Sequence, residues 1–323
     1  MNLHTTPNNQ ILFLKYTSVL PAITKMLLGA IALFFHIPAL ATDDFVTERD
    51  CIPVSKWYSP SLDKVVDQSK LLDKISTHKV ILLGEHHENI QHHRWQLQVI
   101  KDLYSRQKNM NLGFEMFPRR LQSVLDAWVN GKLSEREFLS KVDWDSLWSF
   151  DVSYYLPIFH FAKDNHIPMV ALNVDRELID AVRNKGWDTI PKEQREGLSN
   201  PAAPSRDYLR VLAASYLQHG TSLNSASDTS TSERERFYHF VQGQLLWDRA
   251  MAEGIANIVR REDKPFFVAM MGSWHIINHF GVPHQLADLG INDTVVLVPW
   301  DSHLDCKSVS PRFADAIFGT PEP

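Results

Sequence analysis

The sequence predicts an α/β protein with a mostly parallel central sheet, helices on both faces of that sheet and a helical insertion. Three observations indicate this fold. Short apolar, β-branched runs alternate along the chain with longer segments whose apolar residues recur at helical spacing. Each run stops at a glycine, a proline or a polar residue, where a strand would end. The 323 residues are 44% hydrophobic and 22% charged, a composition that supplies a full core.

Five apolar runs are the predicted strands. They cover residues 80–83, 110–114, 168–172, 266–271 and 294–298. Runs that are apolar at consecutive positions are typical of strands that helices cover on both sides. Between and before these strands we expect helices, among them residues 61–75, a helix opened by the capping box Ser134-Glu135-Arg136-Glu137, and a long helix over 233–261.

Residues 1–41 have the composition of a secretory signal peptide. Lys15 and Lys25 precede the apolar stretch 26–35, and Ala39-Leu40-Ala41 offers a small-residue cleavage site. Cleavage after Ala41 would leave residues 42–323, which we expect to form a single α/β domain with a helical insertion at about 177–232. The alternative is an uncleaved N-terminal anchor. No lipobox cysteine follows the apolar stretch, so the expected location is the periplasm or the medium.

The charge and the cysteines restrict the partners and the compartment. A formal charge of −5 and a pI near 6.3 leave no broad basic field, so nucleic acid is not an expected partner. Cys51 and Cys306 lie near the two ends of the mature chain. In an oxidising compartment they predict one disulfide that joins the terminal segments, and two separate buried thiols are the alternative.

A motif of the form Gly-x-x-His occurs twice, each time directly after a predicted strand. The two copies are Gly84-Glu85-His86-His87 and Gly272-Ser273-Trp274-His275. Side chains at the carboxyl ends of parallel strands meet at one edge of a sheet. A glycine there lets the backbone turn sharply or approach a ligand closely. We therefore expect His87 and His275 to lie close together, although either motif alone could serve only as a turn.

Other polar residues stand at matching positions. Glu115 and Asn173 end the second and third predicted strands, like Glu85 in the first. Gln244 and Asp248 interrupt the apolar stripe of the long helix, one turn apart. Because a buried carboxylate needs partners, they either support the histidines from behind or brace neighbouring helices.

The first motif is followed by two more histidines and, further on, by many aromatic rings. His93 lies on the apolar side of its helix and is predicted to be a hydrogen-bonded core residue, whereas His92 is predicted to face solvent. Such a density of rings predicts packing between elements, with a flat hydrophobic ligand as the alternative. The aromatic block consists of Trp144, Trp148, Phe150, Tyr154 and Tyr155.

The strand-end residues allow two kinds of chemistry. His87, His275 and Glu115 could bind a divalent metal ion and leave a position open for water. Without a metal, the same histidines together with Glu85 and Glu115 could perform acid–base catalysis.

The ordered motifs resemble those of the ChaN family of haem-binding proteins, which belongs to the Tiki superfamily together with erythromycin-esterase-like proteins. The resemblance runs from about Trp57 to Trp300. It rests on Leu83-Gly84-Glu85-His86-His87, Gly113-Phe114-Glu115-Met116-Phe117, Ala171-Leu172-Asn173 with Arg176-Glu177-Leu178, Gln244-Leu245-Leu246-Trp247-Asp248, and Gly272-Ser273-Trp274-His275.

This resemblance implies a three-layer α/β fold, a bacterial envelope location and a role in haem-linked iron uptake. It implies haem as the ligand, bound between two copies of the chain through a tyrosine, and an outer-membrane haem receptor as a partner. Tyr208 and Tyr216 are the candidate haem ligands, and Arg176 joins Asn173 as a supporting residue. The alternative function is a metal-dependent hydrolase that uses the doubled Gly-x-x-His motif, as related proteases of the superfamily do.

Overall fold

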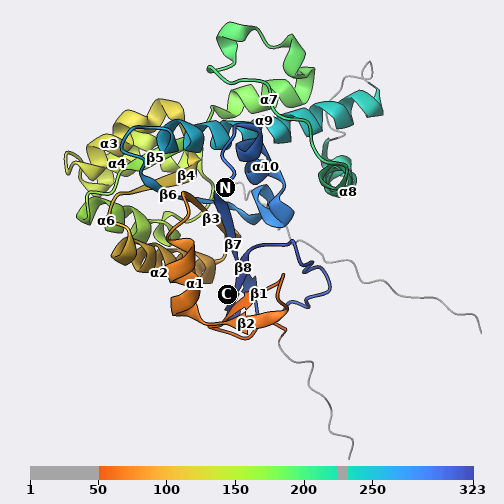
Figure 1. The fold of residues 1–323 in the computed structure, drawn as a ribbon. Coiled ribbons are helices and arrows are strands. Elements are labelled where there is room, and N and C mark those ends of the chain that lie inside the picture. The colour runs from red at the N-terminus through yellow and green to blue at the C-terminus, as the bar shows by residue number, and fades with distance from the viewer. Residues whose placement is uncertain (1–50, 224–231) are drawn as a thin grey trace, which may run out of the picture. The chain divides into compact units, whose positions relative to one another are not determined.

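An eight-stranded sheet organises the part of the chain that the computed structural model describes, residues 51–223 and 232–323 (Figure 1). The strand order is β2-β1-β8-β7-β3-β6-β4-β5, and the strands from β8 to β5 are all parallel. The strands are β1 (Trp57–Ser59), β2 (Lys64–Val66), β3 (Val80–Glu85), β4 (Met110–Pro118), β5 (Met169–Asn173), β6 (Phe266–Gly272), β7 (Thr294–Asp301) and β8 (Ala316–Thr320).

The predicted α/β fold is confirmed, because β3 to β7 coincide with the five predicted apolar runs. Strands β1, β2 and β8 were not predicted, and the helix expected over 61–75 is wrong in its first part. That part forms edge strand β2, which pairs antiparallel with β1. The helix begins only at Gln68, because the side chain of Asp67 accepts a hydrogen bond from the Lys70 N–H and caps it.

Helices cover both faces of the sheet. Alternate strand residues point to opposite faces: Ile81 and Leu83 belong to a core cluster that includes residues of α1, α2, α3, α4 and α6, whereas Val80 and Leu82 belong to one that includes residues of α9 and α10. The helices are α1 (Gln68–Ile75), α2 (Ile90–Arg106), α3 (Gln122–Val129), α4 (Glu135–Val142), α5 (Trp144–Leu147), α6 (Leu156–Asp164), α7 (Arg176–Lys185), α8 (Arg206–Leu223), α9 (Glu233–Val259) and α10 (Gly281–Asp288). The capping box at Ser134 is present at the start of α4, as predicted.

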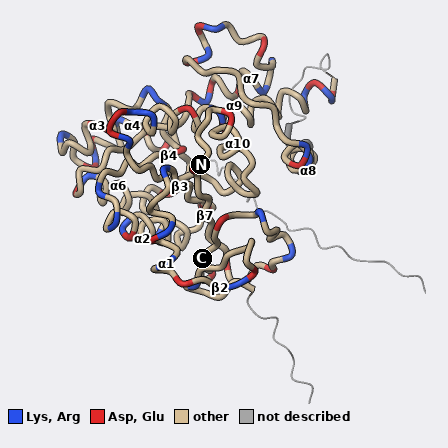
Figure 2. The backbone as a smooth tube through the Cα atoms, viewed as in Figure 1, with Lys and Arg blue, Asp and Glu red and all other residues tan. Residues whose placement is uncertain are grey.

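The long helix α9 connects the sheet to the segment predicted as an insertion. It packs on β5, β6 and α10, and on its other side it carries α7 and α8. The described part of residues 177–232 holds most of α7, two short 3₁₀ turns and α8. Acidic and basic residues are mixed along these helices (Figure 2). None of the described helices combines the length and apolarity needed to cross a membrane, and the predicted signal peptide lies outside the described residues.

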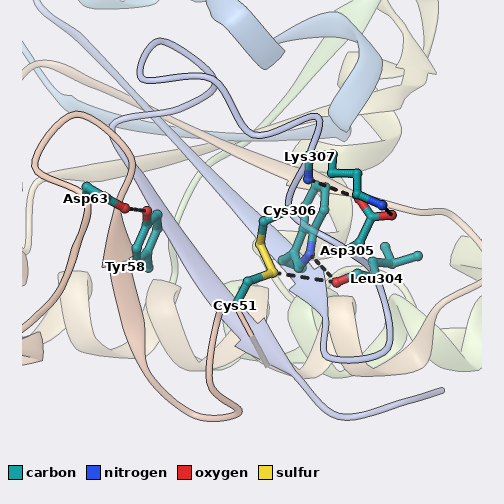
Figure 3. Close-up of a disulfide and its surroundings, with 8 residues drawn as sticks. Cys51, Tyr58, Asp63, Leu304, Asp305, Cys306 and Lys307 are labelled. Carbon is teal, nitrogen blue, oxygen red and sulfur yellow. Dashed lines mark hydrogen bonds and ion pairs between the residues drawn. A yellow bond between two sulfur atoms is a disulfide. The ribbon is translucent and has the colours of Figure 1, made fainter. Parts of the chain in front are cut away.

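The two ends of the described chain are joined covalently. Cys51 and Cys306 form a disulfide with their Cα atoms 6.0 Å apart, which confirms the predicted pairing (Figure 3). Beside it, β1 pairs with β8, and Val54 forms a bridge with Gly319. The N-terminal segment is therefore held against the C-terminal strand by both backbone pairing and the disulfide.

Removal of this disulfide is expected to destabilise the fold. The bond spans 255 residues, and closing so long a loop limits the conformations of the unfolded chain. The double variant Cys51→Ser/Cys306→Ser should lose about 2–4 kcal/mol of unfolding free energy, measured by urea denaturation. Adding reductant should lower the stability of the parent protein toward that of the variant. Identical urea midpoints for the oxidised parent and the variant would contradict this expectation.

Candidate functional site

The two Gly-x-x-His motifs interlock where β3 and β6 end. The parallel register sets Glu85 opposite Gly272. A Cβ on Gly84 would lie 2.6 Å from Ser273 Oγ, and a Cβ on Gly272 would lie 3.2 Å from His87 Nε2. Each glycine thus makes room for a side chain of the other motif. The sequence predicted close approach at these glycines, and the structure shows that the neighbour approaching is the second motif.

Glu85 is the buried centre of the first half of the site. Its Oε1 accepts a 2.6 Å hydrogen bond from His87 Nδ1 and a 3.2 Å bond from the Tyr155 hydroxyl. His93 Nδ1 lies 3.0 Å from Oε2 without the orientation of a hydrogen bond, while His93 Nε2 donates to the His87 carbonyl. Although burial opposes ionisation, the hydrogen bond from His87 and the electrostatic effect of the adjacent His93 ring hold the pKa of Glu85 well below its ordinary value. The partner Tyr155 was not identified from the sequence.

His87 is held by Glu85 but stays partly accessible. Burial lowers the pKa of His87, yet its hydrogen bond to Glu85 and the charge of Glu115 outweigh burial and raise it. With Nδ1 bound to Glu85, Nε2 is the nitrogen that can exchange a proton with a ligand. The ring packs against Trp148 and Phe150, with centroids 4.8 Å away in both cases.

His275 forms the second half of the site and lies between two carboxylates. Nδ1 is 2.6 Å from Asp248 Oδ1, and Nε2 is 3.3 Å from Glu115 Oε1. Burial favours the neutral ring, but Glu115 and Asp248 raise the pKa of His275 to about 10. The ring is therefore an imidazolium at neutral pH. The other oxygen of Asp248 accepts a 2.8 Å bond from the Tyr208 hydroxyl.

Glu115 links the two halves. Its Oε2 accepts a 2.6 Å hydrogen bond from the Gly272 N–H, next to the His87 ring. Burial raises the pKa of Glu115, but the charge of His275 outweighs this effect and lowers it. Asn173 donates to the Glu115 carbonyl at 3.0 Å and so fixes the end of β4 against the end of β5.

The structure gathers most of the predicted site residues; Tyr208 joins them through its bond to Asp248, whereas Arg176 and Tyr216 make no bond to them. Those that meet are Glu85, His87, Glu115, Asn173, His275, Asp248 and Gln244, whose amide nitrogen is 3.3 Å from His275 Nδ1. Arg176 is exposed at the start of α7 and contacts neither histidine. Tyr208 and Tyr216 are buried, and their hydroxyls donate to Asp248 and Glu233.

The arrangement gives no support to the predicted metal centre. Among the residues that the structure describes, no group of three or more histidine, cysteine, aspartate or glutamate side chains is placed to hold a metal ion. Both ring nitrogens of His275 face carboxylates, and Nδ1 of His87 faces Glu85. The site as it stands is a network of histidine–carboxylate pairs, which suits proton transfer.

The prediction that His92 faces solvent is wrong. His92 is only 2% exposed, because the first turn of α2 lies against the ends of β7 and β8. Its Nδ1 accepts from the His86 N–H, so Nε2 donates to Asp301 at 3.0 Å. Asn89 and Thr320 donate to the same carboxylate. This second cluster anchors the turn that carries His87.

A pocket of about 310 Å³ adjoins the network at the carboxyl ends of β4 and β5, facing α7. Trp148 and Trp247 line it, together with Asn173, Met116 and Arg183. Trp148 contacts His87, and the Trp247 ring is 5.4 Å from that of His275. The two tryptophans therefore stand between the pocket and the two histidines.

A family model that describes haem-binding uptake proteins of the ChaN type in the Tiki superfamily matches residues 71–286. The chain belongs to the ChaN family. Among solved structures, it is similar to ChaN of Campylobacter jejuni with cofacial haem, at 18% identity and a TM-score of 0.59, covering 81% of this chain and 95% of that one. It is also similar to the erythromycin esterase EreC in an open conformation, at 11% identity and a TM-score of 0.45, covering 76% and 77%. No curated protein matches.

At 18% identity, the likeness to the Campylobacter protein shows the fold alone. The ChaN family membership rests on the match over residues 71–286, which contains both copies of the Gly-x-x-His motif and the whole buried network.

The pKa of His275 predicts how stability depends on pH. The folded value of about 10 lies above the unfolded value of about 6.5, so the ionic contacts of His275 stabilise the fold fully below about pH 6.5. This stabilisation is lost as the pH rises through 10. The thermal unfolding midpoint should fall progressively over this window, and should fall less in His275→Gln. Parallel pH curves for the two proteins would refute the imidazolium assignment.

Proposed function

We propose that this chain binds haem, as a member of the ChaN family acting in haem-linked iron uptake. The family match over residues 71–286 carries this proposal. Haem binding requires an iron ligand, which can be a tyrosine oxygen, and an apolar surface against the porphyrin.

Tyr238 is the tyrosine best presented to an external haem. Its side chain is 56% exposed near the start of α9, and within the described residues its hydroxyl has no hydrogen-bond partner. By contrast, the hydroxyls of Tyr208 and Tyr216 already donate hydrogen bonds to carboxylates. Leu209 and Leu217 on the neighbouring helix α8 are exposed apolar residues. These features support Tyr238 as the proposed haem ligand, ahead of Tyr208 and Tyr216, the two candidates from the sequence.

A bacterial envelope location belongs to the same proposal. The Cys51–Cys306 disulfide supports it, because such bonds persist in oxidising compartments such as the periplasm. An outer-membrane haem receptor would then be the donor or acceptor of the haem. Pairing of two chains around their haems would cover the exposed leucines of α8.

Titration of the apo-protein with haemin tests the proposal. We expect the Soret band to shift and to saturate at about one haemin per chain, and Tyr238→Phe to weaken binding at least about 10-fold, because the phenol oxygen is lost. Tyr216→Phe is the matched control on the same helical pair and should bind like the parent. Absence of saturable binding at micromolar haemin would refute the proposal. Weaker haemin binding in Tyr216→Phe, with unchanged binding in Tyr238→Phe, would identify Tyr216 as the haem ligand.

Acid–base hydrolysis is the second candidate, favoured by one observation. His87 has Nδ1 fixed by Glu85 and Nε2 near Glu115, and its ring packs against Trp148, which lines a pocket. In such a pair the carboxylate orients the ring, and the free nitrogen takes a proton from a water that attacks a carbonyl carbon. The same proton would then pass to the leaving oxygen.

Hydrolysis of p-nitrophenyl butyrate provides the measurement. His87→Gln should lower the rate by about 100-fold or more, whereas His86→Gln, which changes the exposed neighbour, should not. The rate should rise with pH through the raised pKa of His87, since the neutral ring is the base. Equal rates for parent and His87→Gln would remove this candidate. Loss of activity in EDTA would instead indicate that the reaction depends on the predicted metal ion.

A further inference from the structure

Two buried donors without acceptors line the pocket beside the histidine network. They are Arg183 Nε and Trp247 Nε1, each buried and without a hydrogen-bond partner within the described residues. Leaving a buried donor unsatisfied costs about 1–3 kcal/mol. Two such donors at one pocket indicate a ligand that brings acceptor oxygens.

Arg183 is built into the wall of this pocket. Its side chain crosses α9 at Gly243, where a Cβ would lie 2.4 Å from Arg183 Cγ, and its guanidinium lies 5.5 Å from the Trp247 ring. Arg183 makes no ion pair with any described residue. Burial lowers the pKa of Arg183, and the nearby Asp180 only partly opposes this effect. An anion bound here would stabilise the guanidinium.

The remaining charges of the pocket do not provide that anion. Arg120 is already paired with Asp175 at 2.5 Å. The other acidic lining residues lie exposed at the rim, where water and salt screen them; they are Asp143, Glu177 and Asp180. Arg183 is therefore a partly buried cation of this pocket that has no ion-pair partner among the described residues.

We propose that this pocket binds a small molecule that carries a carboxylate or a phosphate next to a flat apolar group. The anion would accept hydrogen bonds from Arg183 and Trp247, and the flat group would pack between Trp148 and Met116. A volume of about 310 Å³ is at the small end for ligand pockets, so the ligand is smaller than haem. The proposal therefore goes beyond haem binding and assigns a second ligand site.

A hydrogen-bonded chain connects this pocket to His87. The Trp148 indole N–H donates to the Tyr155 hydroxyl at 3.0 Å, and Tyr155 donates to Glu85, which holds His87 Nδ1. A ligand packed on Trp148 consequently lies one side chain away from the ring that can transfer a proton.

Calorimetric titration of the full chain with phenyl phosphate and with benzoate tests the site, and the pair distinguishes phosphate from carboxylate. Benzyl alcohol is the uncharged control. We expect one or both anions to bind saturably and the alcohol not to bind. Arg183→Gln should weaken anion binding at least about 10-fold, because a charge-assisted hydrogen bond is lost. Lys185→Gln removes an exposed charge from the same helix outside the pocket and should leave the affinity unchanged.

Failure of both anions to saturate at about 10 mM, or equal affinities in Arg183→Gln and Lys185→Gln, would overturn the proposal. Thermal unfolding and haemin binding of Arg183→Gln show whether it is folded. If it is not, Trp247→Phe keeps an aromatic group at this position, smaller than the indole and without its N–H donor, and it should weaken anion binding several-fold. An unchanged affinity in that variant would equally overturn the site.

Discussion

The parallel pairing of β3 with β6 sets Glu85 opposite Gly272, and the buried histidine network depends on it. The ends of the two strands carry Gly84 and Gly272, which have no Cβ atoms. The side chain of Ser273 therefore lies against Gly84, and the ring of His87 lies against Gly272. The register then places Glu115, from the next strand, against the Gly272 N–H. A larger residue at either glycine would separate the two halves of the site.

Every carboxylate of the network faces a histidine, which explains how so many ionisable groups are buried together. His275 lies between Asp248 and Glu115, and His87 is bound to Glu85. Each carboxylate also accepts a hydrogen bond from a fixed donor: Tyr208, the Gly272 N–H or Tyr155. Buried charges persist when they are paired and hydrogen-bonded in this way.

Much of the fold was predictable because a buried parallel strand leaves a clear pattern of consecutive apolar residues ended by glycine or a polar residue. The same pattern places Glu85, Glu115, Asn173 and His275 at strand ends. Strands β1, β2 and β8 were missed because they are short edge or terminal strands, and Lys64–Val66 has no continuous apolar run. In addition, β1 pairs with β8, which lies at the other end of the described chain.

Side-chain partners were harder to predict than elements. The sequence marks Tyr155 only as one ring in an aromatic block, yet its hydroxyl reaches Glu85 across 70 positions. His92 looked like a surface residue because the strand ends that cover it come more than 200 positions later. The stripe of α9 did point to Gln244 and Asp248, since polar residues at inward positions must meet other polar groups.

The bond between Cys51 and Cys306 makes almost the whole described chain one closed covalent ring. A protease that cuts the backbone once anywhere between the two cysteines would open this ring without releasing a fragment. The nicked molecule would gain only the mass of one water and would remain one covalent molecule until it is reduced, and its two pieces would stay close enough to remain associated around the sheet.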